Sequence, residues 1–357
     1  MATTAATPMV GTAVPTMPAP IAMTMGEPAG IGIEIALKTW RRRSVYDLPP
    51  FYLIADPDHV RATLAALEKL DRSQRVRLAM TEITTPGETA GYFDQALPVF
   101  PQALAAMPEP GKLNKANAGA VLGAIEVAVA HITAGQASAV VTNPIQKSVL
   151  YETGFKHPGH TEFLAELCGG NHLPVMMLSC PDLKTVPVTI HMSLADAIAE
   201  LSTEMIVERT LITAQALDRD LGFSPPRLAI AGLNPHAGES GALGRAEAAI
   251  IQPAIYQLRA HGIQVIGPLA ADSMFHEAAR RNYDAAICMY HDQALIPVKT
   301  LGFEYGINTT LGLPIVRTSP DHGTALDIAG QGQANCQSLI SAVAQAGLMA
   351  RYRARAA

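Results

Sequence analysis

Short apolar runs alternate with amphipathic segments along almost the whole chain, and this alternation restricts the choice of fold class. Two segments, residues 116–134 and 246–261, carry apolar side chains at helical spacing, and each is followed or ended by a glycine suited to a left-handed helix cap. The runs of strand length are residues 21–25, 51–55, 138–142, 186–190, 227–233, 263–267 and 285–290. Strands that alternate with helices predict an α/β layered fold with a largely parallel sheet.

The chain is long enough for about two domains. It has 357 residues, of which 49% are hydrophobic and 16% charged. No linker is visible after residue 20, so we expect the two domains to be interleaved. Residues 1–20 are rich in Ala, Thr and Pro and lack the pattern of a signal peptide, which predicts a disordered extension. No run reaches the roughly 18 apolar residues of a membrane span.

Charge and cysteine content exclude several classes of protein. The net charge is −5, and the longest basic run is Arg41–Arg43, which argues against a nucleic-acid partner. The four cysteines lie far apart without CxxC spacing, which argues against a disulfide framework and a thiolate metal site. A reducing, cytoplasmic location is expected.

Two glycine-rich segments are candidates for ligand binding. After the first predicted strand, Gly26, Gly30 and Gly32 precede a helix that we expect to begin near residue 33. Their backbone N–H groups could bind a phosphate, or the segment could be a tight turn, because it departs from the GxGxxG pattern. Residues 319–335 form a second such segment, either a plain surface loop or a site whose polar side chains hydrogen-bond an adenosine. The final helix is predicted over residues 337–346.

Three of the eleven histidines follow predicted strands directly. His191, His236 and His291 each lie at a strand exit, and in an open α/β sheet this edge is where ligands bind. Three imidazoles that converge there could bind a divalent cation such as Zn²⁺. Such a cation would polarise an alcohol and stabilise the carbonyl formed as hydride departs. Their spacing matches no local zinc motif, so three unconnected histidines remain the alternative.

Charged and amide side chains cluster near the same predicted strand exits. Asp272 and Asp292 could orient a ligand imidazole or accept a proton. Lys299, Asn308 and Arg317 follow downstream and suit a substrate that carries phosphate and carboxylate groups. Exposed loop charges are the alternative for any single one of them.

Long ordered motifs resemble the 4-phosphohydroxythreonine dehydrogenase family, a branch of the isocitrate and isopropylmalate dehydrogenase fold. The most specific are NPHAGE, YHDQ with the downstream PVK, and RTSPDHGTA, and the similar segments span nearly everything from residue 21 onward. One departure is Ile33, which stands where the family pattern GIGPEI has proline.

The resemblance implies roles for particular positions. His191, His236 and His291 match three metal ligands (Zn, Mg or Co) that come from both subunits of a homodimer. The positions that match substrate-binding residues are His160, Thr161, Lys299, Asn308 and Arg317. Asp272 and Asp292 match acidic positions of the same pocket, and with Lys299 they are the candidates for catalytic proton transfer, although no single general base is assigned. NAD, or alternatively NADP, would lie on a loop that contains His322, Gly323, Thr324, Asp327 and Asn335.

The resemblance also implies a domain arrangement and a reaction. Residues 21–145 plus 298–357 would form the cofactor-side domain, and residues 146–297 the domain for metal, substrate and dimerisation. The reaction would be NAD-dependent oxidation of 4-phosphohydroxythreonine at C3, followed by loss of carbon dioxide to give 3-amino-2-oxopropyl phosphate, a step in pyridoxal 5'-phosphate synthesis. One alternative is a paralogue that oxidises threonate 4-phosphate or a cyclic diol. A remote alternative is a non-catalytic or acyltransferase-like protein of the same fold.

Overall fold

A single twelve-stranded mixed sheet runs through the molecule. The computed structural model describes residues 19–70, 78–157 and 159–356. The strand order is β3-β4-β2-β1-β5-β12-β11-β6-β7-β10-β8-β9. The strands are β1 (Ile21–Thr24), β2 (Phe51–Ala55), β3 (Met80–Glu82), β4 (Leu97–Pro101), β5 (Ala139–Thr142), β6 (Val175–Cys180), β7 (Leu183–Pro187), β8 (Arg227–Ala231), β9 (Gln264–Leu269), β10 (Ala285–Cys288), β11 (Ile307–Leu311) and β12 (Arg317–Pro320).

Most strand pairs are parallel, and the antiparallel pairs lie together in the middle of the sheet. There β11 pairs antiparallel with β12 and β6, and β6 pairs antiparallel with β7. The predicted α/β fold with a largely parallel sheet is therefore confirmed. The antiparallel centre arises because β6 and β7 are joined by a tight hairpin and β11 and β12 by a short loop, and neither connection has room for a crossover helix.

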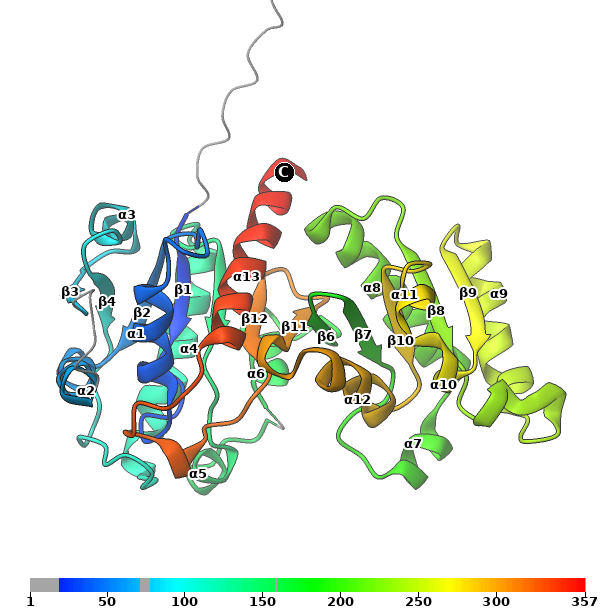
Figure 1. The fold of residues 1–357 in the computed structure, drawn as a ribbon, viewed down its shortest axis with the longest axis horizontal. Coiled ribbons are helices and arrows are strands. Elements are labelled where there is room, and N and C mark those ends of the chain that lie inside the picture. Colours follow the sequence, from blue (N-terminus) through cyan, green and yellow to red (C-terminus); the bar gives the residue numbers. More distant parts are fainter. Residues whose placement is uncertain (1–18, 71–77, 158, 357) are drawn as a thin grey trace, which may run out of the picture.

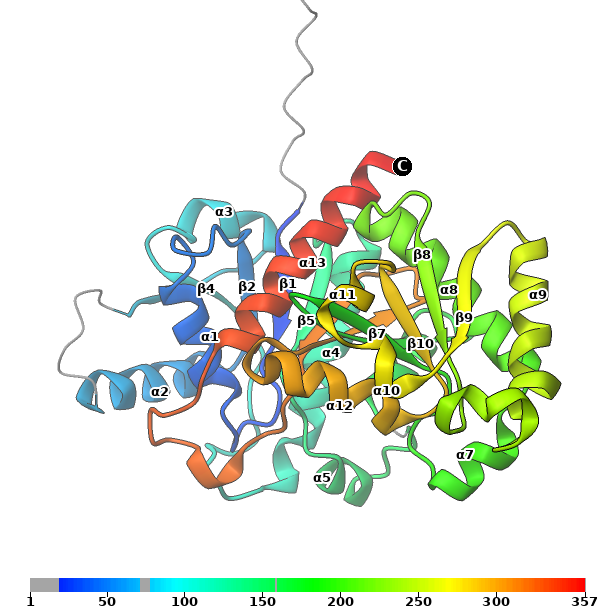
Figure 2. The same cartoon turned by 45° about the vertical axis from the view of Figure 1, so that its right-hand side comes forward.

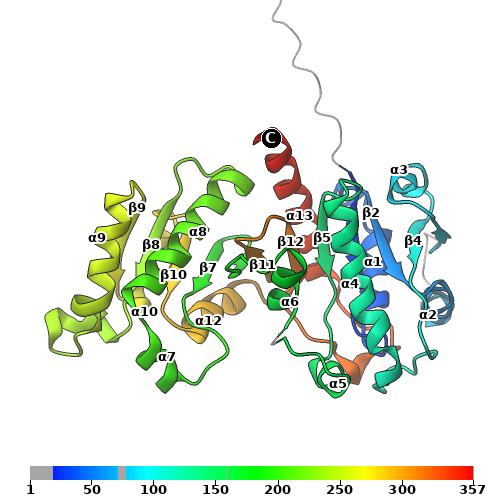
Figure 3. The ribbon, with the colours of Figure 1, turned by 180° about the vertical axis from the view of Figure 1, so that it is seen from behind.

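Helices cover both faces of the sheet. On one face lie α1, α12 and α13 (Figure 1), and on the other α4, α6 and α8 (Figure 3). The α-helices are α1 (Gly32–Arg41), α2 (Pro57–Leu70), α3 (Thr89–Tyr92), α4 (Ala118–Thr133), α5 (Lys147–Glu152), α6 (His160–Leu167), α7 (Leu194–Glu200), α8 (Thr203–Leu221), α9 (Gln252–Ala260), α10 (Ala271–Met274), α11 (Glu277–Arg280), α12 (His291–Gly302) and α13 (Gln337–Ala356). Single helical turns are η1 (Pro86–Glu88), η2 (Lys115–Asn117), η3 (Pro235–Gly241), the π turn η4 (Glu247–Ile251), η5 (Phe303–Tyr305) and η6 (Leu326–Ile328).

The sequence patterns located some strands and missed others. Residues 51–55 match β2, whereas the run predicted over residues 186–190 is shifted, because β7 ends at Pro187. Strands β3, β4, β6, β11 and β12 were not predicted. Strand β11 reads INTTL and β12 reads RTSP, so their composition resembles a loop, although both are almost wholly buried in the middle of the sheet.

The last helix is longer than its pattern indicated. We expected it to end at Ala346, but α13 continues to Ala356. Gly347 lies inside the helix. A Cβ on Gly347 would come within 2.6 Å of the Pro49 ring, so glycine is needed there for close packing rather than for a cap.

Helix α4 is a core helix on the face of the sheet that also carries α6 and α8 (Figure 3). Residues Lys115–Thr133 form the one helix in the described ranges that is long and apolar enough to cross a membrane. It packs against β1, β2 and β5, and it carries seven buried residues, so its apolar character serves the core.

The order of the strands follows the domain division predicted from the resemblance. Strands from residues 21–145 and 298–357 occupy one half of the sheet, strands from residues 146–297 the other, and the halves meet where β11 pairs with β6. Whether the halves act as separate domains stays a prediction. The disordered extension was predicted for residues 1–20, and residues 1–18 lie outside the described ranges.

Candidate active site

The carboxyl ends of the parallel strands face one end of the molecule. Helices α5 and α7, which follow β5 and β7, gather at this end, opposite the C-terminus of α13 (Figure 2). In α/β sheets this edge binds ligands. All the side chains described below lie on segments that leave the sheet at this end or flank it.

Two of the three predicted metal ligands lie together. The imidazole rings of His191, after β7, and His291, the first residue of α12, have centroids 6.3 Å apart. Both line a cavity of about 400 Å³ together with Tyr290 and Asp292. His291 Nδ1 is 2.7 Å from Asp292 Oδ1, an arrangement that fixes the ring and leaves Nε2 available to a ligand.

The surroundings of His191 favour its neutral form. Burial lowers the pKa of His191, and the nearby Lys147 lowers it further, although Glu162 acts in the opposite direction. Its backbone has φ of 47°, a left-handed conformation that is uncommon outside glycine. Strained backbone of this kind often occurs at functional sites. A neutral imidazole is the form that binds a metal.

His236 does not join this pair within one chain. It lies on η3, between β8 and η4, and its side chain is exposed. In the described part of the chain, no group of three His, Cys, Asp or Glu side chains is close enough to hold a metal ion. The chain therefore presents two imidazoles in one place and the third in another.

Hydrogen bonds connect the exits of the strands that lead to all three histidines. Thr189 Oγ1 donates to the Met289 carbonyl at 2.9 Å, and the Met289 N–H donates to Gln293 Oε1 at 2.6 Å. Gln293 Nε2 then donates to the Gly232 carbonyl at 2.7 Å. Gln293 is buried, so its amide rigidly joins the end of β10 to the end of β8. The sequence reasoning missed Gln293, although it lies only two positions after His291.

A buried guanidinium forms the centre of a second group of predicted site residues. Arg317 is 3% exposed and donates to Thr142 Oγ1 at 2.8 Å and to Thr310 Oγ1 at 3.0 Å. Burial lowers its pKa to about 10, and the Glu162 carboxylate acts in the opposite direction. Within the described ranges no carboxylate forms an ion pair with Arg317. Burial of a cation is costly unless it is paired, so this site suits an anionic ligand.

Further polar groups near Arg317 lack protein partners. His160 begins α6, and its buried Nε2 has no hydrogen-bond partner in the part of the chain that the structure describes. Burial, together with Arg317 and Lys147, lowers the pKa of His160 well below its ordinary value. Asn308 Oδ1 on β11 is likewise buried and without a partner there. Thr161 follows His160 in the first turn of α6.

Lys299 forms an ion pair that the sequence reasoning did not identify. Its Nζ lies 3.3 Å from Asp321 Oδ2, and Asp321 directly precedes His322. Burial raises the pKa of Asp321, although Lys299 counteracts it. Asp321 lies in the quoted motif RTSPDHGTA, but nothing local distinguished it, because its partner is 22 residues away in sequence.

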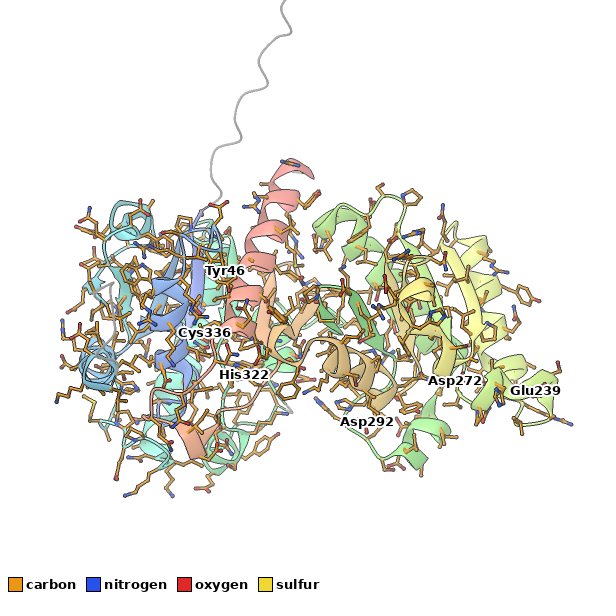
Figure 4. The ribbon with its side chains drawn as sticks, in the orientation of Figure 1. Tyr46, Glu239, Asp272, Asp292, His322 and Cys336 are labelled. Atoms are coloured by element: carbon orange, nitrogen blue, oxygen red, sulfur yellow. The ribbon has the colours of Figure 1, made fainter. Side chains whose placement is uncertain are left out.

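The two candidate catalytic carboxylates lie on one cavity. Asp272 on α10 and Asp292 on α12 both line a cavity of about 370 Å³, and both are exposed. Figure 4 shows Asp272 toward Glu239 of η3, and Asp292 nearer the middle of the molecule at the start of α12. Lys299 does not line this cavity and faces Asp321 instead.

The predicted cofactor residues lie in different places. His322, Gly323 and Thr324 closely follow β12, whereas Asn335 lines a separate cavity. His322 Nε2 is buried and has no partner within the described residues, and burial lowers the pKa of His322. Gly323 is exposed, and Thr324 Oγ1 donates to Gln146 Oε1 at 3.1 Å. His322 lies close to the Lys299–Asp321 ion pair.

The end of the loop lines a cavity of about 630 Å³. Asn335 contributes to it, as do Lys38 and Arg42 of α1 and its C-cap. Lys38 Nζ donates to the carbonyls of residues 332 and 334, so α1 holds the cavity wall in place. Asp327 on η6 is exposed and does not line this cavity. The size of the cavity and its polar lining suit a nucleoside.

The first glycine-rich segment packs against protein. A Cβ on Gly26 would come within 2.6 Å of the Pro144 carbonyl oxygen, and one on Gly30 within 2.8 Å of the Thr324 carbonyl oxygen. Ile31 N–H also donates to the Thr324 carbonyl. Of the two readings left open by the sequence, these contacts favour the tight turn, whose glycines let three backbone segments meet.

Comparison with known proteins places the chain in a family. The model of the family described as "Pyridoxal phosphate biosynthetic protein PdxA" matches residues 48–346. The chain belongs to the PdxA family. Among relatives of this PdxA chain is the 4-hydroxythreonine-4-phosphate dehydrogenase of Bradyrhizobium diazoefficiens, 52% identical over 335 residues that cover 93% of this chain and 97% of the relative.

Solved structures agree with this assignment. The crystal structure of 4-hydroxythreonine-4-phosphate dehydrogenase from Klebsiella pneumoniae matches with a TM-score of 0.82 and 34% identity, and covers 94% of this chain and 99% of that one. A terephthalate 1,2-cis-dihydrodiol dehydrogenase from Burkholderia xenovorans LB400 matches with a TM-score of 0.60 and 27% identity over 92% of this chain and 98% of that one. The predicted membership of the family is thus confirmed.

Proposed function

We propose that this PdxA chain is a 4-hydroxythreonine-4-phosphate dehydrogenase of pyridoxal phosphate biosynthesis, which uses NAD and a divalent metal. The substrate name comes from relatives at about half identity over most of the chain. The observation that carries the chemistry is the pair of imidazoles of His191 and His291, backed by Asp292, at the exits of neighbouring strands.

The donor atoms of this pair fit a divalent cation. Imidazole nitrogens bind Zn²⁺ and Co²⁺ well, and the Asp292 carboxylate stabilises the ring of His291 in the orientation a metal needs. In a homodimer, His236 of the partner subunit would complete the ligand set, because within one chain His236 lies apart from the pair. When bound, the metal polarises the substrate alcohol and stabilises negative charge on its oxygen.

Arg317, His160 and Thr161 would hold the substrate phosphate. The buried guanidinium supplies a charge-assisted, two-pronged donor, and His160 Nε2 and the Asn308 amide, which lack protein partners, would supply further hydrogen bonds. In this proposal the anchoring would direct the C3 hydroxyl toward the histidine pair. Arg317 also favours an anionic substrate over an uncharged one.

Proton transfer would fall to charged groups near the histidine pair. The Lys299–Asp321 ion pair and Asp292 are within the same region, and each can accept or return a proton as the alcohol is oxidised and the β-keto acid loses carbon dioxide. Lys299 is held by Asp321, which fixes the position of its ammonium group. NAD, or NADP, would supply the hydride acceptor when bound, and the 630 Å³ cavity beside Asn335 would hold its adenosine. We place the enzyme in the cytoplasm.

A substrate panel with metal added or withheld tests this function. The full-length protein is stripped with chelator, and NADH formation is followed with 4-phosphohydroxythreonine, threonate 4-phosphate and a cis-dihydrodiol. We expect turnover of the first compound, loss of activity after stripping, and recovery with Co²⁺, Zn²⁺ or Mg²⁺. Full activity without metal would contradict the metal site. Faster turnover of threonate 4-phosphate would reassign the substrate to that of a paralogue.

A further inference from the structure

The turn that carries His236 has an unusual backbone. Residues 236–240 all have positive φ, at 51°, 51°, 80°, 43° and 54° in chain order, and only the middle one is glycine. They form one turn of left-handed helix. Each non-glycine residue in this conformation costs about 1–2 kcal/mol, and such residues normally occur singly. Something outside the turn must therefore stabilise it.

A single buried carboxylate accepts hydrogen bonds from the base of this turn. Glu247 is 6% exposed, and its Oε1 accepts from the N–H groups of Leu233 at 2.9 Å and Asn234 at 2.7 Å. Its Oε2 accepts from Asn234 Nδ2 at 2.9 Å. Burial raises the pKa of Glu247, but these hydrogen bonds outweigh that effect and hold the pKa below its ordinary value. No cation forms an ion pair with Glu247 in the described ranges.

The turn closes tightly around this carboxylate. A Cβ on Gly238 would come within 2.6 Å of Glu247 Oε2, and one on Gly232 within 3.3 Å of Oε1. Gly232 and Gly238 thus leave room for the carboxylate. Gly244 leaves room for the Asn234 side chain, because a Cβ at position 244 would come within 2.5 Å of the Asn234 amide.

The backbone at Glu247 is also irregular. Residues Glu247–Ile251 form a π turn, which leads into α9. Pro253 in the first turn of α9 has no N–H to donate to the preceding turn, so the helix opens there. Single π turns in helices occur frequently at functional sites. Here the wider turn lets the Glu247 side chain reach back to the end of β8.

We propose that Glu247 is a positioning residue, whose carboxylate holds residues 233–240 so that His236 is presented from a left-handed turn at the end of β8. The assignment rests on the proposed function, in which His236 completes a metal site with a second copy of the chain. In this proposal Glu247 acts through the turn and not on the metal or the substrate. Within the described residues its side-chain hydrogen bonds go to Leu233 and Asn234, the two residues that lead into the turn.

Metal binding measured without turnover tests this role. Metal-free full-length wild type, Glu247→Ala and Glu247→Gln are titrated with Co²⁺ alone, by calorimetry and by the visible absorption of the bound ion. We expect Glu247→Ala to weaken Co²⁺ binding 10- to 100-fold, the usual effect of losing a group that orients a ligand. Glu247→Gln keeps an oxygen for the two backbone N–H groups, so its affinity should stay within a few-fold of wild type.

Asp284→Asn is the matched control. Asp284 accepts the Arg227 N–H and pairs with the Arg227 guanidinium at the opposite ends of the same strands, β8 and β10. Its loss should lower the melting temperature without changing Co²⁺ affinity or the Co²⁺ spectrum. A merely structural role for Glu247 would make its variants behave as this control does.

The outcomes separate the inference from the function on which it rests. If wild type binds Co²⁺ and a folded Glu247→Ala binds it equally well, the positioning role is overturned and the proposed function stands. If wild type binds no Co²⁺, the metal site and the inference are both overturned. If Glu247→Ala does not fold, Gly238→Ala replaces it in the test, because the added methyl group displaces the Glu247 carboxylate. An unchanged Co²⁺ affinity of Gly238→Ala would also overturn the positioning role.

Discussion

Arg317 is a buried cation whose surroundings suit an anionic ligand. It is almost fully buried, yet its hydrogen bonds go to threonine hydroxyls and not to a carboxylate. A protein that needed only packing at this place would use an apolar side chain, because an unpaired buried cation is costly. The arrangement is consistent with a phosphate that pairs with the guanidinium on binding.

Replacing Arg317 by Lys should therefore weaken substrate binding more than it slows the chemistry. Lysine keeps the charge but loses the two-pronged geometry, so we expect KM for the phosphorylated substrate to rise roughly 10- to 100-fold with a smaller change in kcat. Steady-state kinetics measure both. Arg209→Lys on α8, where the guanidinium donates to the Met205 carbonyl of the same helix, is the control and should leave KM unchanged. An unaltered KM for Arg317→Lys would contradict the phosphate assignment.

Among the elements, α8 and α13 are joined by a buried ionic clamp. Asp220 on α8 is fully buried and accepts two hydrogen bonds from Arg219 and two from Arg353 on α13. Arg353 also donates to the Pro314 carbonyl at 2.7 Å. Helix α8 belongs to the chain segment of one half of the sheet and α13 to that of the other, so the clamp ties the halves together.

Asp220→Asn should destabilise the protein by about 2 kcal/mol at pH 7, because two half-buried arginines lose the counter-charge of a buried carboxylate. Burial raises the pKa of Asp220, but the two arginines hold it below its ordinary value of 3.8. A carboxyl whose pKa is lowered by folding stabilises above its unfolded pKa and loses that contribution as pH falls through the folded value. The wild-type and variant stabilities should thus converge below about pH 4.

Urea unfolding at several pH values measures this difference. Glu277→Gln, which removes an exposed ion pair with Arg281, is the control and should cost less than about 0.5 kcal/mol at any pH. A difference between Asp220→Asn and wild type that stays constant from neutral to acid pH would show that the clamp acts through shape and not through charge.

For the whole molecule, the separation of His236 from the other two histidines has a consequence for assembly. If each site takes His191 and His291 from one subunit and His236 from the other, inactive variants should complement each other. A mixed dimer of His236→Ala and His291→Ala subunits contains one site with all three histidines and one site with two replaced. Random mixing makes half the dimers mixed, so we expect about a quarter of wild-type activity to return.

The measurement is NADH formation after the two purified variants are unfolded and refolded together. Each variant refolded alone is the control and should stay inactive. A mixture of His191→Ala with His291→Ala provides a second control, because these two residues come from the same subunit and no mixed dimer contains a complete site. Recovery in that control, or none in the first mixture, would contradict a shared site.

Local patterns in the sequence were sufficient for the alternating α/β architecture and for the positions of His191 and His291. Apolar periodicity reports which side chains are buried, and in parallel strands the exits must face one edge. Knowing where the predicted strands end was therefore enough to predict that His191 and His291 lie at the same edge of the sheet. The family resemblance added the substrate and cofactor positions, which no periodicity could provide.

The tertiary structure alone decided how distant segments meet. The central strands β11 and β12 carry Asn308 and Arg317. The polar composition of these strands gave no apolar pattern to predict them, because the neighbouring strands and α13 bury them. The Lys299–Asp321 ion pair, the Gln293 amide between two strand exits and the Glu247 carboxylate under the His236 turn all join residues that are distant in sequence or leave no periodic signal. Such contacts depend on strand order and on loop backbone conformation, which a one-dimensional pattern of burial does not encode.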